Sequence, residues 1–147
     1  MTDGLSASPE LERFVAAQDG VYEAALAEIR AGRKRSHWMW FVFPQIDGLG
    51  FSATSKHFAI RSRAEAEAYV AHPVLGARLI ECAQTLLSLD RTSAEEIFGE
   101  VDALKLRSSA TLFAAVTPEG SPFHRILERY FGGAQDERTL QLLQRSE

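Results

Sequence analysis

Apolar residues recur at helical spacing along most of the chain, and turn residues separate the runs. The first run opens at Ser8 and Pro9, an N-cap residue followed by a first-turn proline. Its apolar stripe contains Leu11, Phe14 and Val15. Gln18 falls within this stripe, so we expect its amide either to bond within the core or to belong to a polar site. A second amphipathic run covers residues 21–29.

Residues 38–43 are consecutive apolar residues rich in aromatic side chains. This pattern fits a short buried strand, and a helical turn is the alternative. Pro44 ends either structure, and residues 45–54 are typical of a glycine-bearing loop. The Gly48-x-Gly50 step is not a dinucleotide fingerprint, because a third glycine in register and a βαβ setting are both missing.

Helix signals return in the second half of the chain, each with its own cap. The longest amphipathic arc follows Pro73 and includes Cys82, which we expect to be a small buried apolar residue. We predict helices from Ser62 to before Pro73, from Pro73 to Leu89, from a cap within residues 92–96 to Gly99, from an Asp102 cap to Val116, from Ser121 to Gly132 and from an Asp136 cap onward. The chain therefore predicts a mainly α protein with one compact multi-helix domain over residues 8–144. We expect at most a short strand near 38–43, and frayed ends at 1–7 and 145–147.

Composition narrows the functional classes. The 147 residues are 46% apolar and 24% charged, as in ordinary globular domains. One cysteine excludes an internal disulfide and a multi-cysteine metal site, and the four histidines are scattered. A net charge of −4 gives no general attraction to nucleic acid. No stretch predicts a signal peptide or a membrane span, so we expect a cytoplasmic protein with no metal, cofactor, nucleic acid or membrane partner.

Lys105 stands out in the predicted helix after Asp102. At about 100° per residue it lies at the centre of an apolar arc, with Ser108 and Ser109 on either side. That arc contains Leu104, Leu106, Leu112, Phe113 and Val116. Burying an unpaired lysine costs several kcal/mol. Lys105 therefore needs a counter-charge or a ligand, unless its ammonium reaches solvent past the end of the helix.

The aromatic segment supplies a second group of candidates. Tryptophan offers a large stacking surface, and His37 and Gln45 offer hydrogen-bonding groups beside it. The alternative is that Trp38 and Trp40 are simply core residues. Our leading hypothesis is a pocket between this segment and the Lys105 helix, which binds, or binds and hydrolyses, a nucleotide-derived or ADP-ribose-like small molecule.

The candidate ligand-binding residues are His37, Trp38, Trp40, Gln45, Lys105, Ser108, Ser109, Gln18, Arg78 and Asp136. No motif assigns a catalytic residue or an oligomeric state. The rival hypothesis is a non-enzymatic interaction module that docks an acidic partner through Arg33, Lys34 and Arg35.

Several long strings of the chain resemble a family of bacterial proteins of unknown function, often labelled "calpastatin" in genomes. The resemblance covers residues 9–143 and implies a mainly α-helical fold with no established activity. No calpain-inhibitor repeats accompany the label. The strings are Arg13-Phe14 with Ala17-Gln18, residues 34–45 with Gly48-Leu49-Gly50, residues 72–76 with Arg78-Leu79, Ile97-Phe98-Gly99 with Asp102, residues 105–109 with Thr111-Leu112-Phe113, and Asp136 with Thr139-Leu140.

The order of motifs is also similar, more weakly, to the NAD- and ADP-ribose-associated family of small helical N-glycosidases. Lys56, His57 and Phe58 would occupy that family's Glu-His-Tyr/Phe step. The resemblance implies hydrolysis of a ribosylated nucleobase-like or flavin-precursor substrate. Lys56 replaces the glutamate, which removes the carboxylate expected to act in catalysis.

Overall fold

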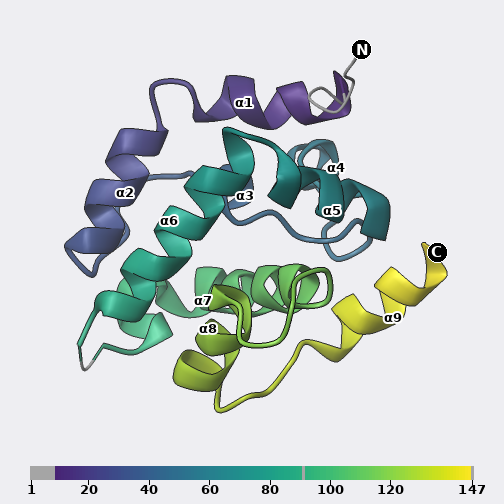
Figure 1. The fold of residues 1–147 in the computed structure, drawn as a ribbon. Coiled ribbons are helices and arrows are strands. Elements are labelled where there is room, and N and C mark those ends of the chain that lie inside the picture. Colours follow the sequence, from purple (N-terminus) through teal and green to yellow (C-terminus); the bar gives the residue numbers. More distant parts are fainter. Residues whose placement is uncertain (1–8, 91, 147) are drawn as a thin grey trace.

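A computed structural model describes residues 9–90 and 92–146 of the chain (Figure 1). A short 3-10 helix, Pro9–Leu11, precedes the α-helices. The α-helices are α1 (Glu12–Gln18), α2 (Tyr22–Arg30), α3 (Met39–Val42), α4 (Ala53–His57), α5 (Arg63–Ala71), α6 (Leu75–Ser88), α7 (Ala94–Ala114), α8 (Pro122–Phe131) and α9 (Glu137–Arg145). Together they contain more than half of the 147 residues, which confirms the mainly α prediction.

The aromatic segment forms the helical turn α3, so the strand alternative for residues 38–43 is wrong. The backbone N–H groups of Phe41 and Val42 donate to the carbonyl of Trp38 at 3.0 and 3.2 Å, which closes the turn. Its apolar side chains suit a buried strand and a buried turn equally, so the pattern did not decide between them. Across the described residues the only β pairing is an isolated bridge between Ile46 and Ile60.

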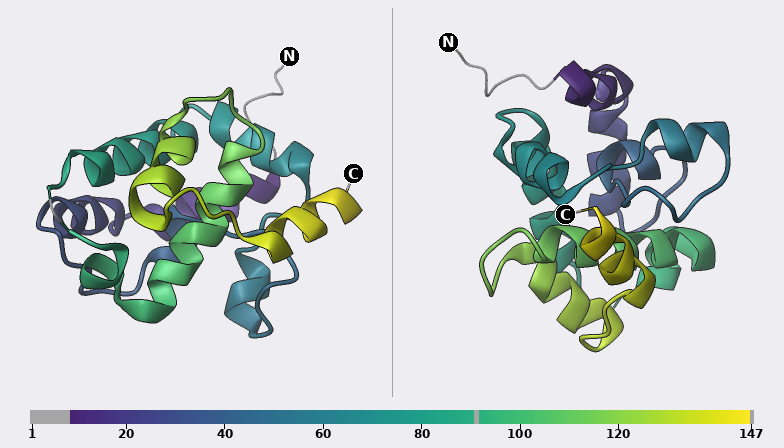
Figure 2. Two further views of the ribbon diagram at one scale, coloured as in Figure 1. Left: turned by 90° about the horizontal axis from the view of Figure 1, so that it is seen from below. Right: turned by 90° about the vertical axis from the view of Figure 1, so that its right-hand side faces the viewer.

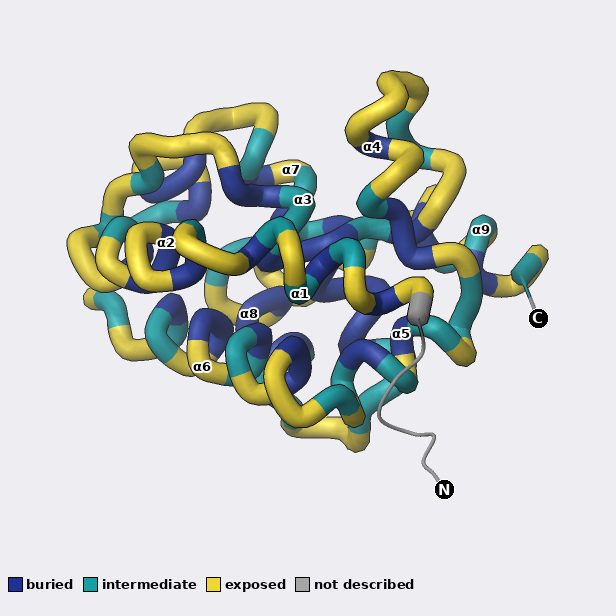
Figure 3. Tube along the Cα trace, turned by 90° about the horizontal axis from the view of Figure 1, so that it is seen from above, coloured by how far each residue is buried: buried dark blue, intermediate teal, exposed yellow. Residues whose placement is uncertain are grey.

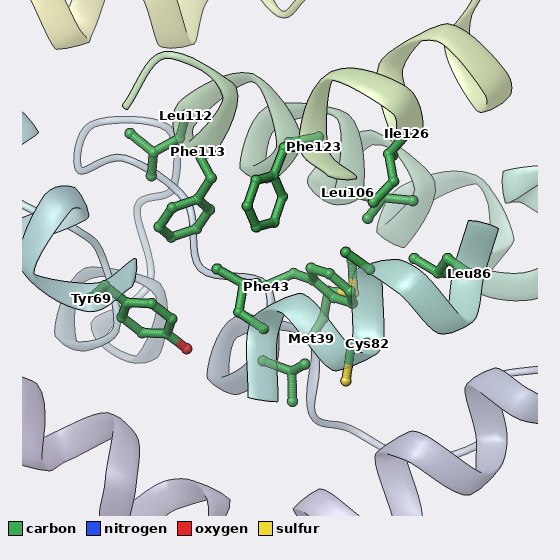
Figure 4. Packing of buried hydrophobic residues seen from close by; sticks show 14 of the residues in the cluster. Met39, Phe43, Tyr69, Cys82, Leu86, Leu106, Leu112, Phe113, Phe123 and Ile126 are labelled. Carbon is green, nitrogen blue, oxygen red and sulfur yellow. The ribbon is translucent and has the colours of Figure 1, made fainter. Parts of the chain in front are cut away.

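Helix α6 lies at the centre of the fold. It packs against α2, α5 and α8, and α7 packs against α5, α8 and α9. Figures 1 and 2 show α1 on one side of the body, α7 and α8 on the other, and α6 between them. Figure 4 shows Phe113 of α7 and Phe123 of α8 meeting Phe43, which follows α3, in one core. Cys82 of α6 is fully buried in this core, as the sequence predicts.

Side-chain caps set many of the helix boundaries. Ser93 and Glu96 form a complete capping box at α7, and Ser62, Ser121 and Asp136 accept backbone N–H bonds at their helices. The sequence did not suggest the cap at α6, where His72 Nδ1 accepts the N–H groups of the first turn. The expected cap at Ser8 and the expected frayed residues 1–7 and 147 lie outside the described part of the chain.

Helix α7 joins two helices that the sequence predicts separately. Gly99 breaks the helical geometry with φ 82° and ψ 167°, as the predicted stop requires, but helical residues resume at once. Asp102 therefore lies inside α7, and its predicted role as an N-cap is wrong. The predicted face is also displaced, because Leu104 is 61% exposed and the buried face runs through Leu106, Ala110 and Phe113. Lys105 thus stands at the border between core and solvent.

The segment after α3 is the most exposed part of the body. Figure 3 shows the trace of α4 projecting from the rest of the molecule, with most of its length exposed. Phe51, which precedes it, is 86% exposed. The bridge between Ile46 and Ile60 closes the base of this projection.

Candidate functional site

A cavity of about 150 Å³ opens between α3 and the middle of α7. The connection between α2 and α3 forms its third side. Aromatic and charged side chains line it together, which is the combination that the sequence hypothesis requires. The lining residues are Lys34, His37, Trp38, Met39, Trp40, Phe41, Asp102 and Lys105.

Asp102 lies between two lysines of this cavity. Its Oδ2 accepts from Lys34 Nζ at 2.8 Å, and its Oδ1 pairs with Lys105 Nζ at 3.1 Å. The side chains are 9% exposed for Lys34, 18% for Asp102 and 23% for Lys105. The chain has three lysines, and two of them are at this one carboxylate. The counter-charge that Lys105 needs is therefore Asp102.

Each lysine also lies over an indole ring. Lys105 Nζ is 4.3 Å from the ring centroid of Trp40, and Lys34 Nζ is 5.2 Å from that of Trp38. A cation over an aromatic face is stabilised by the ring's quadrupole. Both ammonium groups are thus held by an indole on one side and a carboxylate on another.

The charge state of Asp102 follows from these contacts. Burial raises the pKa of Asp102, but the hydrogen bonds and charges of Lys34 and Lys105 outweigh burial and hold it below its usual value. The carboxylate therefore stays ionised at neutral pH. With both ammonium groups protonated, the three side chains carry a net charge of +1.

Glu28 of α2 holds one wall of the cavity in place, although no pattern in the sequence singles it out. Its Oε1 accepts from the backbone N–H groups of Arg35 and Ser36 and from Trp38 Nε1, and its Oε2 accepts from Ser36 Oγ. These distances run from 2.6 to 3.0 Å. Burial raises the pKa of Glu28, but the four hydrogen bonds dominate and lower it to about 2. An ionised Glu28 thus orders the segment that carries His37 and Trp38.

The structure brings only part of the predicted set to the cavity. His37, Trp38, Trp40 and Lys105 line it, with His37 exposed at the rim and Trp38 almost wholly buried. Gln45 lies just beyond, where its Oε1 accepts from Trp40 Nε1 at 3.1 Å. Gln45 lines a second, much smaller hollow under the loop before α4.

Ser108, Ser109 and Asp136 do not line this cavity, although both serines lie within one helical turn of Lys105 in α7. Ser108 Oγ donates to the Leu104 carbonyl and to Asp136 Oδ2, which caps α9. Ser109 is fully buried, and among the described residues its hydroxyl has no hydrogen-bond partner. Both serines are buried in the body of the protein, whereas the Lys105 side chain is 23% exposed.

Gln18 and Arg78 belong to a polar network between α1, α3 and α6. The Gln18 amide donates to the Phe41 carbonyl at 2.7 Å and accepts from Arg78 Nη1 at 3.1 Å. Tyr69 Oη lies 3.3 Å from the same amide nitrogen. Of the two alternatives for Gln18, these contacts match the core hydrogen-bonding group, and they hold the end of α3 in place.

The residues 56–58, which were compared with a motif of the N-glycosidases, do not line the cavity. Lys56 and His57 are exposed at the end of α4, where the His57 ring contacts Phe58. Neither residue lines the space beside Lys105. Within the described residues, no group of three or more metal-ligating side chains is placed to hold an ion, and no helix is long and apolar enough to cross a membrane.

Fold and site together define an all-helical domain with one aromatic cavity that contains two lysines and an aspartate. The model of a family described as "Protein of unknown function (DUF1810)" matches residues 8–143, and the chain belongs to this family. Among solved structures, the chain is similar to the conserved hypothetical protein Rv1873 from Mycobacterium tuberculosis. The two share 50% identity with a TM-score of 0.90, over 93% of this chain and 99% of that one. A comparison with curated proteins gives no match.

Proposed function

We propose that this protein binds a small nucleotide-derived anion at the cavity between α3 and α7. The observation that supports the proposal is the convergence of Lys34 and Lys105 on one space walled by Trp38 and Trp40. Ammonium groups attract phosphate or carboxylate oxygens, and the partly exposed indole of Trp40 provides surface for a base or sugar.

The size of the cavity limits how much of the ligand it encloses. Pockets that surround a whole drug-sized ligand have volumes of about 300–1,000 Å³. A volume of about 150 Å³ accommodates one ring or one phosphoryl group. The rest of the ligand would then lie across the rim, beside the exposed His37.

The lining residues support binding better than hydrolysis. A general base is most effective when its pKa lies near the working pH. The lowered pKa of Asp102 and its two lysine partners make it a weak base and prevent it from serving as an acid. Glycosidic hydrolysis would require a carboxylate free of such partners beside the ligand, and among the described residues Asp102 is the one carboxylate that lines this cavity.

The rival proposal, docking of an acidic partner, draws on the basic run at residues 33–35. Lys34 points inward to Asp102, which leaves the exposed Arg33 and Arg35 for such a partner. Two exposed charges attract an acidic surface less strongly than three. We therefore place the small-molecule proposal first.

A thermal-shift screen against nucleotides, ADP-ribose, NAD and flavin precursors tests the proposal. A ligand at about 100 times its dissociation constant adds about 2.7 kcal/mol to the stability of the fold. The shift should be lost in Lys105→Met. It should be kept in Lys56→Met, which removes an exposed lysine of α4 that does not line the cavity. The proposal fails if no compound stabilises the protein, or if the shift is the same in Lys105→Met.

A further inference from the structure

The Asp102 carboxylate occupies the position between the two lysines that a ligand oxyanion would take. One carboxylate oxygen faces Lys34 and the other faces Lys105, so each ammonium already has an anionic oxygen at 2.8 or 3.1 Å. We infer that Asp102 is an internal anion that an incoming ligand must displace, and that the ligand enters through a terminal phosphomonoester. This inference rests on the proposed function and narrows its ligand class.

Each lysine has contacts besides this carboxylate. Lys105 lies over the Trp40 ring and Lys34 over the Trp38 ring. The backbone N–H of Lys34 also donates to the Ile97 carbonyl at 2.7 Å, which ties the segment to α7. Removing the Asp102 charge should therefore leave two positioned ammonium groups with no anion between them.

Competition with Asp102 favours a ligand that carries two charges. A monoanion, such as a phosphodiester, would replace the carboxylate charge for charge and would gain no additional attraction to the two ammonium groups. A phosphomonoester carries about −1.5 to −2 charges at pH 7 and presents three acceptor oxygens. Two of its oxygens can accept hydrogen bonds from the two ammonium groups while the third remains available, so replacement of the Asp102 carboxylate favours the phosphomonoester.

Adenosine 5′-monophosphate and its 3′,5′-cyclic form make a matched pair of probes. Both contain the same base and sugar, but the cyclic phosphodiester carries a single charge. Calorimetric titration of the wild-type protein should give an affinity for the open nucleotide that is at least about tenfold higher, or about 1.4 kcal/mol.

Asp102→Asn is the decisive variant. It should bind the cyclic nucleotide and inorganic phosphate at least about tenfold more tightly than wild type does, because the competing charge is gone. Adding Lys105→Met should remove the gain. Glu100→Gln is the matched control, since it removes one exposed negative charge from the same helix and should leave both affinities unchanged.

The outcomes separate this inference from the proposed function. The inference is overturned if Asp102→Asn brings no gain, or if wild type binds both nucleotides equally. Equal binding that still depends on Lys105 would leave the proposed function standing. Conversely, if wild type binds no nucleotide but Asp102→Asn gains phosphate binding that requires Lys105, Asp102 does occupy an anion site, but both the proposed function and displacement by a nucleotide are contradicted. If Asp102→Asn does not fold, the wild-type comparison of the two nucleotides decides.

Discussion

At the scale of single residues, Glu28 connects the sequence to the shape of the cavity. Its carboxylate accepts four hydrogen bonds from a segment that is seven to ten residues away in sequence. One of these bonds satisfies the indole N–H of Trp38, whose side chain is almost fully buried. The position of Trp38, and through it the place of the Lys34 ammonium, therefore depends on Glu28 being ionised.

Glu28→Gln should destabilise the fold by about 1–3 kcal/mol at neutral pH, because one amide oxygen cannot replace the four bonds of a carboxylate. Glu28 has a lowered pKa in the folded chain, so its charge stabilises the fold above the ordinary glutamate pKa of about 4.3. This stabilisation is lost as pH falls toward the folded value of about 2.

Urea unfolding at pH 7 and at about pH 3.5 measures this effect. The stability difference between wild type and Glu28→Gln should shrink at the lower pH. Glu23→Gln, an exposed glutamate on the same helix, should change stability little at either pH. A constant difference for Glu28→Gln would show that the carboxylate charge does not order the segment.

At the scale of helices, the contact between α5 and α6 requires the absence of a side chain at Gly76. A Cβ atom there would lie 1.9 Å from the carbonyl oxygen of Val70, which no rotamer change can relieve. Gly76 is buried within the first turn of the central helix α6. The close approach of these two helices thus depends on glycine, although glycine is normally a poor helix residue.

Gly76→Ala should therefore destabilise the protein, although alanine raises helix propensity by about 1 kcal/mol. Overpacking against backbone typically costs about 1–3 kcal/mol or more. Ala77→Gly, at the exposed next position, serves as the control and should cost about 1 kcal/mol through propensity alone. Thermal unfolding of both variants checks the signs, and an increase in melting temperature for Gly76→Ala would contradict the packing argument.

The sequence predicts helices better than it predicts which way they face. Caps and glycine stops gave most helix boundaries correctly, because these signals are local. The face of α7 was misassigned because apolar residues surround much of that helix, and only its contacts with α5, α8 and α9 select the buried side. The spacing of Ser108 and Ser109 from Lys105 predicted a shared helix face, but spacing alone could not show that neither serine would line the cavity. Trp38 and Trp40 were foreseen from their residue type, whereas Asp102 was interpreted as a cap and Glu28 was not selected.

At the scale of the whole molecule, the cavity joins parts of the chain that are far apart in sequence. Residues 34–41 and residues 102–105 meet only because α7 crosses beside α3. The local sequence pattern could show that Lys105 needs a counter-charge. It could not show that Lys34 would share that counter-charge, the Asp102 carboxylate. Lys105→Met should change the stability of the fold little, because Asp102 still pairs with Lys34 when the charge of Lys105 is removed. We expect its melting temperature to stay close to that of wild type.

The two tryptophans of the chain both line the cavity, so tryptophan fluorescence, excited selectively over the three tyrosines, reports on its occupancy. The most direct measurement is a fluorescence titration of wild type and Lys105→Met with adenosine 5′-monophosphate. We predict a saturable change in wild type, and an affinity at least about tenfold lower in Lys105→Met, since a charged hydrogen bond contributes about 1.5–3 kcal/mol. A folded wild-type protein that shows no saturable change, or equal affinities for the two proteins, would contradict the assignment of this cavity as an anion-binding site.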